Sequence, residues 1–183
     1  MVQRIPSMHG VTTERLLFRA ISMDDRPWWM EYINSADAIR FMSLTVGSED
    51  SCREFIQRAL DRQRTDGSGL NAIIEQATGK PVGMIGLLTQ VVDGVDELEV
   101  GYHLLPSAWG NGYATEAAIA CREFAREHKL VPSVVSLIDH ENFASQNVAK
   151  RNGMSFEKDT VHRGTPAMVW RVLLDQPLRD ASR

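Results

Sequence analysis

The sequence predicts an α/β protein of the α+β type, with helices on both faces of a mixed, mostly antiparallel central sheet. Two pairs of apolar segments, at 70–89 and 154–174, are each separated by a turn, as in β-hairpins. Residues 97–138 follow the order strand, helix, strand. A helix that joins two neighbouring strands favours a parallel βαβ unit, so this segment is expected to add one parallel pair to the sheet.

The N-terminal third is expected to hold one strand and three helices. The pattern of residues 13–19 (Thr-Glu-Arg-Leu-Leu-Phe-Arg) alternates well enough to predict a first strand. Asp24 and Pro27 mark the start of a helix, and a short helix is plausible at 36–41. A longer helix is predicted over 49–65, where apolar residues recur at spacings of three and four.

The middle of the chain is predicted to form three strands separated by two turns. The turns are expected at Thr78-Gly79 and at 91–96. The strands are expected at 70–76, 81–89 and 97–105, the last one stopped by Pro106.

The C-terminal third alternates helices and strands. An apolar face of small and aromatic residues predicts a helix over 112–128, and Asn142 is a candidate N-cap for a further helix. The predicted order is helix 112–128, strand 133–138, helix 143–151 and a closing hairpin of strands 154–162 and 166–174.

Size and composition indicate one globular domain over 1–183, with its core at about 12–174. The 20 basic and 24 acidic residues give a net charge of −4, which argues against non-specific nucleic-acid binding. No apolar run suits a signal peptide or a bilayer span, so the expected location is the cytoplasm. Cys52 and Cys121 lack metal-ligand spacing and are expected to be reduced thiols rather than a disulfide.

The strongest candidate site is the glycine-rich turn at 109–114, where a strand leads into a helix. Glycines let the backbone approach an anion, and the first N–H groups of a helix point outward with favourable dipole potential. The turn lacks the lysine and hydroxyl of an ATP-hydrolysing loop and the three-glycine dinucleotide pattern. A pyrophosphate group held without metal fits best, although a tight turn with no ligand and a nucleotide-phosphate site both remain open on spacing alone.

Three motifs together resemble a known family. Residues 100–106 and 109–117 look like the coenzyme A motif of the GNAT superfamily of N-acetyltransferases, and specifically of its RimJ/RimL-type branch. Residues 13–19 and 142–154 resemble the opening strand and the second coenzyme-contacting helix of that branch. Gly112 and Ala114 fill the last two marked places of the motif, whereas Trp109 stands where Gln or Arg is usual. The resemblance covers about 12–174 and implies a GNAT-like fold.

The resemblance implies that acetyl-coenzyme A is the co-substrate and that no metal is needed. The backbone of six residues would hold the pyrophosphate: Gly110, Asn111, Gly112, Tyr113, Ala114 and Thr115. The strand residues that would pair with the pantetheine arm are Tyr102, His103, Leu104 and Leu105. The side chain of Asn142 would contact the end of the pantetheine, and its alternative role is that of an N-cap.

Acetyl transfer to an amine requires a neutral amine, because an ammonium group has no free electron pair. Glu97, Glu99 and His103 share one parity and therefore one strand face. By resemblance Glu99 is the candidate base, and the alternative is a solvated carboxylate. Ser145 is the candidate proton donor near the sulfur, and the alternative is a serine bonded to the backbone. A tyrosine is the more common donor in the superfamily, but none occurs in the second motif.

The resemblance also places an acceptor pocket at the first helices, where Trp28, Trp29, Tyr32 and Phe41 are candidates either for the pocket or for the core. The predicted function is transfer of an acetyl group to a primary amine, on a protein N-terminus or a small molecule, by direct attack in a ternary complex. The alternative is a non-catalytic sensor or scaffold domain that binds acyl-coenzyme A. No nucleic-acid or membrane partner is expected, and a homodimer is a possible assembly.

Overall fold

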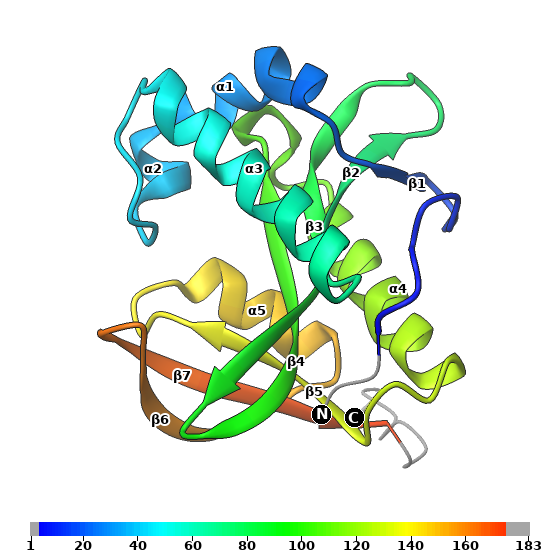
Figure 1. Ribbon diagram of the computed structural model, residues 1–183, viewed down its shortest axis with the longest axis vertical. Coiled ribbons are helices and arrows are strands. Elements are labelled where there is room, and N and C mark those ends of the chain that lie inside the picture. Colours follow the sequence, from blue (N-terminus) through cyan, green and yellow to red (C-terminus); the bar gives the residue numbers. More distant parts are fainter. Residues whose placement is uncertain (1–3, 175–183) are drawn as a thin grey trace.

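A single seven-stranded sheet organises the chain in the computed structural model, which describes residues 4–174 (Figure 1). The strand order is β1-β2-β3-β4-β5-β7-β6, and β4 and β5 form the parallel pair of an otherwise antiparallel sheet. The predicted fold class is therefore confirmed. The strands are β1 (Leu16–Ala20), β2 (Gly69–Glu75), β3 (Pro81–Val92), β4 (Val95–Leu104), β5 (Ser133–Ile138), β6 (Ser155–His162) and β7 (Thr165–Leu173).

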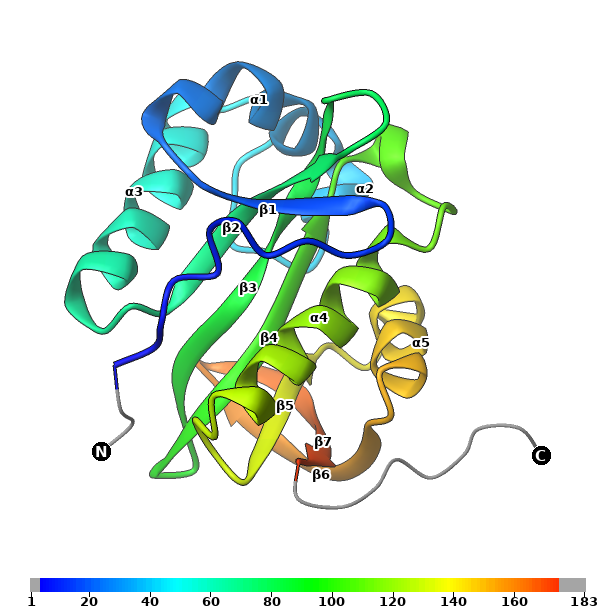
Figure 2. The same cartoon turned by 90° about the vertical axis from the view of Figure 1, so that its right-hand side faces the viewer.

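Helices cover both faces of this sheet. Figure 2 shows α3 on one side, with α1 beside it, and α4 and α5 on the other side. The α-helices are α1 (Arg26–Asn34), α2 (Ala36–Ile39), α3 (Glu49–Thr65), α4 (Tyr113–Glu127) and α5 (Phe143–Arg151). Short 3₁₀ helices at Met23–Asp25 and Pro106–Ala108 precede α1 and follow β4.

Alternation along β4 sends its side chains to two different environments. Leu98 and Val100 are almost fully buried in the main core, while the neighbouring Glu97 and Glu99 are half-buried on the opposite face. Burial of such large apolar side chains is the main source of stability for a domain of this size. Cys52 and Cys121 are free and buried, as expected for reduced thiols.

The hairpin between β3 and β4 is tighter than the sequence predicts. Only Asp93 and Gly94 form the turn, at φ angles of 50° and 82°, so the expected turn at 91–96 is too wide. Two residues with positive φ make the turn that best matches the twist of a β-hairpin, and asparagine, aspartate and glycine tolerate it. Both strands are thereby longer than predicted at the hairpin end.

The parallel pair forms a fork. The register of β4 with β5 contains one residue pair, Glu99 with Val135, although β4 continues to Leu104. The carbonyl of Val100 points toward β5, because it accepts a 2.9 Å hydrogen bond from Ser136 Oγ. Main-chain groups two residues further along a strand point the same way, so those of Tyr102 and Leu104 face the opening. The fork thus exposes a strand edge beyond Glu99.

Candidate active site

Glu99 lies at the base of the fork. Its Oε2 accepts a 2.6 Å hydrogen bond from Gln90 Nε2 on the neighbouring strand β3. The backbone N–H of Leu137 on β5 also donates to the carboxylate. The carboxylate therefore touches both β3 and β5 at the point where β4 and β5 separate.

Burial raises the pKa of Glu99 above its ordinary value. The hydrogen bonds from Gln90 and Leu137, and the charges of Arg62 and Arg163, favour the ionised form and oppose that rise. A carboxylate whose pKa is raised by burial is, once ionised, a stronger base than a solvated one.

The other two residues of the same parity have different partners. Glu97 forms an ion pair with Arg171 of β7, with 2.7 Å between Oε1 and Nη2. His103 Nδ1 lies 3.1 Å from the Tyr32 hydroxyl, and its ring packs edge-on against Phe55. Burial lowers the pKa of His103 to about 4, so this imidazole is neutral at pH 7. Of the three, only Glu99 contacts both β3 and β5 at the base of the fork.

The glycine turn at the start of α4 has the geometry of an anion cradle. Gly110 and Gly112 have φ angles of 79° and 78°, in the left-handed region that glycine adopts without strain. Gly112 is the N-cap of α4, and no side chain caps the first N–H groups of this 15-residue helix. A Cβ atom built on Gly110 would meet no atom within 4 Å, so the backbone there is open. These features fit a bound phosphate.

Arg15 supports this cradle from the side of β1. Its Nη1 donates to the Asn111 carbonyl at 3.0 Å, and its Nε pairs with Glu116 of α4 at 2.7 Å. In a trans peptide the carbonyl and the next N–H point in opposite directions. Because Arg15 holds the Asn111 carbonyl, it fixes the direction of the Gly112 N–H. The sequence pattern did not single out Arg15 for this role, and its spacing from the turn carries no signal.

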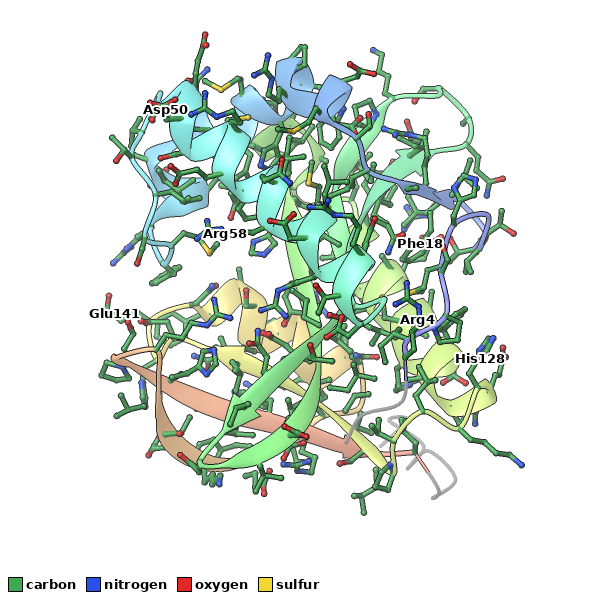
Figure 3. The ribbon with its side chains drawn as sticks, in the orientation of Figure 1. Arg4, Phe18, Asp50, Arg58, His128 and Glu141 are labelled. Carbon is green, nitrogen blue, oxygen red and sulfur yellow. The ribbon has the colours of Figure 1, made fainter. Side chains whose placement is uncertain are left out.

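The N-terminus of α5 approaches the fork from the face of α4. Asn142 Oδ1 accepts a 3.1 Å hydrogen bond from the Ser145 N–H, so Asn142 is an N-cap. The Tyr102 hydroxyl donates to the Ser145 carbonyl at 2.8 Å. This bond ties β4 to α5 beside the opening. Glu141, labelled in Figure 3, pairs with Arg40 at 3.0 Å and links the same loop to the segment after α2.

Several candidates lie away from the opening. Leu105 follows the end of β4, is buried, and donates its N–H to the Val82 carbonyl. Trp29 and Tyr32 are buried and stacked, with ring centroids 4.4 Å apart, so both belong to the core. Trp28 is partly buried and donates its indole N–H to Asp25 at 2.8 Å.

We also searched residues 4–174 for metal-ligand clusters and for membrane-spanning helices. Within residues 4–174, no group of three or more His, Cys, Asp or Glu side chains is arranged to hold a metal ion. None of the helices in this range has the length and apolar character that a membrane span requires.

Comparison with known proteins agrees with this geometry. The family model described as an acetyltransferase (GNAT) domain matches residues 15–155. YkkB of Bacillus subtilis is 28% identical over 161 residues, which are 87% of this chain and 93% of YkkB. A crystal structure of an acetyltransferase from Agrobacterium tumefaciens superposes with a TM-score of 0.75 and 27% identity, over 92% of this chain and 94% of that one.

RimL, the ribosomal L7/L12 α-N-protein acetyltransferase solved in complex with coenzyme A, has the same fold. Its TM-score is 0.72 at 18% identity, over 91% of this chain and 98% of RimL. The fold, the fork and the family match together define an acetyl-CoA-dependent acyltransferase. The chain belongs to the GNAT acetyltransferase family.

Proposed function

We propose that this protein is an N-acetyltransferase that moves the acetyl group of acetyl-CoA to a primary amine by direct attack in a ternary complex. The observation that carries the proposal is the position of Glu99, a partly desolvated carboxylate at the base of an open strand fork. A base at that point can take a proton from an amine that approaches from the face of α3.

The proposed cofactor site runs from the cradle to the fork. The backbone N–H groups of residues 110–115 would bind the pyrophosphate, and the exposed edge of β4 would pair with the pantetheine arm. Along that edge the main-chain groups of Tyr102 and the Leu104 N–H face the opening, while the Leu104 carbonyl already accepts a 3.1 Å hydrogen bond from the Trp109 indole. The main-chain groups of His103 face β3, and the Leu105 N–H donates to the Val82 carbonyl. Asn142 would contact the pantetheine through Nδ2, since its capping bond uses Oδ1.

The proposed chemistry involves two proton transfers, one from the attacking amine and one to the departing sulfur. When bound, acetyl-CoA supplies an activated thioester. Glu99 would accept a proton from the amine, directly or through one water, and Gln90 would hold the carboxylate in place. Ser145, in the first turn of α5, would donate a proton toward the sulfur, where the helix N-terminus also favours negative charge.

The proposed setting is the cytoplasm, and the proposed unit is a single domain over 1–183 with its core at about 12–174. RimL supports an amine acceptor, since that protein acetylates a ribosomal-protein α-amine and was solved with coenzyme A. A protein N-terminus and a small-molecule amine both fit a primary-amine acceptor.

The second candidate is a sensor or scaffold domain that binds acyl-CoA without transfer, which the same cradle and fork would allow. Two measurements on the purified protein separate the candidates: calorimetry with acetyl-CoA, and thiol release from acetyl-CoA with a panel of primary amines. Amine-dependent thiol release supports the enzyme. Tight binding with no release by any amine supports the sensor, and absence of binding refutes both.

A further inference from the structure

An open cleft of about 540 Å³ lies next to Glu99, on the face of the sheet that α3 covers. It is bounded by the C-terminal end of α3, by the ends of β3 and β4, and by the turn between β6 and β7. Its lining residues are Arg62, Asp66, Thr89, Gln90, Val91, Asp96, Val161, His162 and Arg163. Of these lining residues, only Gln90 takes part in the acetyl transfer proposed above.

Two arginines enter the cleft from opposite sides, one from α3 and one from the β6–β7 turn. Arg62 Nη1 donates to the Thr89 carbonyl at 2.8 Å, and Arg163 Nη2 donates to Gln90 Oε1 at 3.2 Å. These acceptors are an uncharged carbonyl and an uncharged amide. A guanidinium has five N–H donors, so both arginines retain donors for a ligand. The charge of Arg163 also lowers the pKa of Arg62, which shows that the two like charges are close.

One amide group connects the cleft to the proposed base. Gln90 donates from Nε2 to Glu99 at 2.6 Å and accepts at Oε1 from Arg163 at 3.2 Å. The carboxylate and the guanidinium are thus separated by the width of a single amide. A ligand with its amine at Glu99 and an anionic group at Arg163 would need only a few bonds between the two.

The cleft also contains acidic groups, which restricts the ligand further. Asp66 accepts hydrogen bonds from the Ser68 N–H and the Thr89 hydroxyl, and Asp96 lies on the β4 side. Burial and the two arginines lower the pKa of His162, which keeps its ring uncharged at neutral pH. Because the lining has charges of both signs, it suits a ligand that carries both signs.

We propose that the acceptor is a free amino acid or a close analogue, with its amine at Glu99 and its carboxylate held by Arg163 and Arg62. This inference rests on the proposed N-acetyltransferase function and names the substrate class of that activity. Bidentate guanidinium–carboxylate bonding supplies both affinity and orientation, so it would place the amine in line with the fork. A polyamine, which has no anionic group, would leave both guanidiniums without an anion.

The test compares free amino acids with their own carboxamides as acceptors, with thiol release giving kcat/KM. The carboxamide has the less basic amine, so intrinsic reactivity favours it, and a preference for the free acid reports recognition of the carboxylate. Wild-type protein should prefer the free acids by about 10- to 100-fold, the range expected for charged hydrogen bonds. Arg163→Gln should reduce this preference to about threefold or less.

Arg53→Gln is the matched control, since Arg53 lies on α3 and pairs with the exposed Asp50 at the other end of that helix (Figure 3). It should keep the wild-type preference. The inference would be overturned if wild-type protein used the carboxamides as well as, or better than, the free acids. It would also be overturned if Arg163→Gln kept the wild-type preference. Either result would leave the N-acetyltransferase function intact. A stronger preference for peptides over free amino acids would also overturn it, in favour of a protein N-terminus. If no amine of any kind caused thiol release, that result would instead refute the proposed N-acetyltransferase function.

Discussion

Replacement of Glu99 by glutamine removes the proposed base and changes little else. The glutamine has the same length, and its carbonyl oxygen can still accept the hydrogen bond from Gln90 Nε2. It cannot accept a proton from the amine. A positioned general base typically contributes about 10²- to 10⁴-fold to a rate, so kcat/KM should fall by that factor, which is about 3 to 5 kcal/mol of transition-state stabilisation.

The pH dependence adds a second readout. Burial raises the pKa of Glu99, so the wild-type rate should rise with pH through a midpoint above about 4.3, the ordinary value of a glutamate. The Gln variant should lack this limb. The raised pKa means that the folded protein binds the proton of the Glu99 carboxyl more tightly than the unfolded chain does. As the pH rises above the pKa of Glu99 in the unfolded chain, loss of this proton therefore lowers the free energy of unfolding. The variant should therefore unfold at the same temperature as wild type at pH 7, or at a higher one.

The assay is thiol release at saturating acetyl-CoA over a range of pH, with circular dichroism to follow unfolding. Glu54→Gln is the matched control, because Glu54 is exposed on α3 and should leave both measurements unchanged. A Glu99→Gln variant that is folded and acetylates amines within about threefold of wild type at every pH would refute the role of Glu99 as the base.

Three further predictions concern neighbouring residues. Arg15→Ala removes the hydrogen bond to the Asn111 carbonyl that orients the turn. Loss of one such charged hydrogen bond should weaken the binding of coenzyme A, measured by calorimetry, by about tenfold. An unchanged affinity would contradict the role of Arg15. Ser145→Ala should lower kcat by about tenfold with little change in KM for acetyl-CoA, and an unchanged kcat would remove Ser145 as the donor. His103 stays neutral down to about pH 4, so it should favour the folded state fully above about pH 6.5 and lose that effect as the pH falls toward 4. Urea unfolding of His103→Gln should lack this part of the acid destabilisation, and identical pH curves for the two proteins would contradict it.

Much of the fold could be predicted because strong local signals set its elements. Helix α3 was predicted at 49–65 and lies at Glu49–Thr65, where the serine cap and the spacing of Phe55, Ile56 and Ala59 agree. Strand β5 and helix α5 also have the predicted bounds. The parallel pair followed from a helix placed between two strands.

The surroundings of Glu99 could not be predicted, because they depend on strand register and on contacts between distant residues. The predicted strand 81–89 ended one residue before Gln90, which the tight turn at Asp93-Gly94 places inside β3. Arg163 reaches the site from 73 residues further along the chain, and no local pattern marks that contact. Resemblance to the family makes Glu99 the candidate base, but it gives no information on the partners that change the pKa of this carboxylate.

We expect acetyl-CoA to lie in the fork between β4 and β5 with its reactive end at Glu99. A crystal structure with acetyl-CoA tests it most directly. The pyrophosphate should lie on the backbone of residues 110–115, the pantetheine beside Tyr102 and Leu104, and the thioester within reach of Glu99. A cofactor bound elsewhere, or strands β4 and β5 paired continuously beyond Glu99, would contradict it.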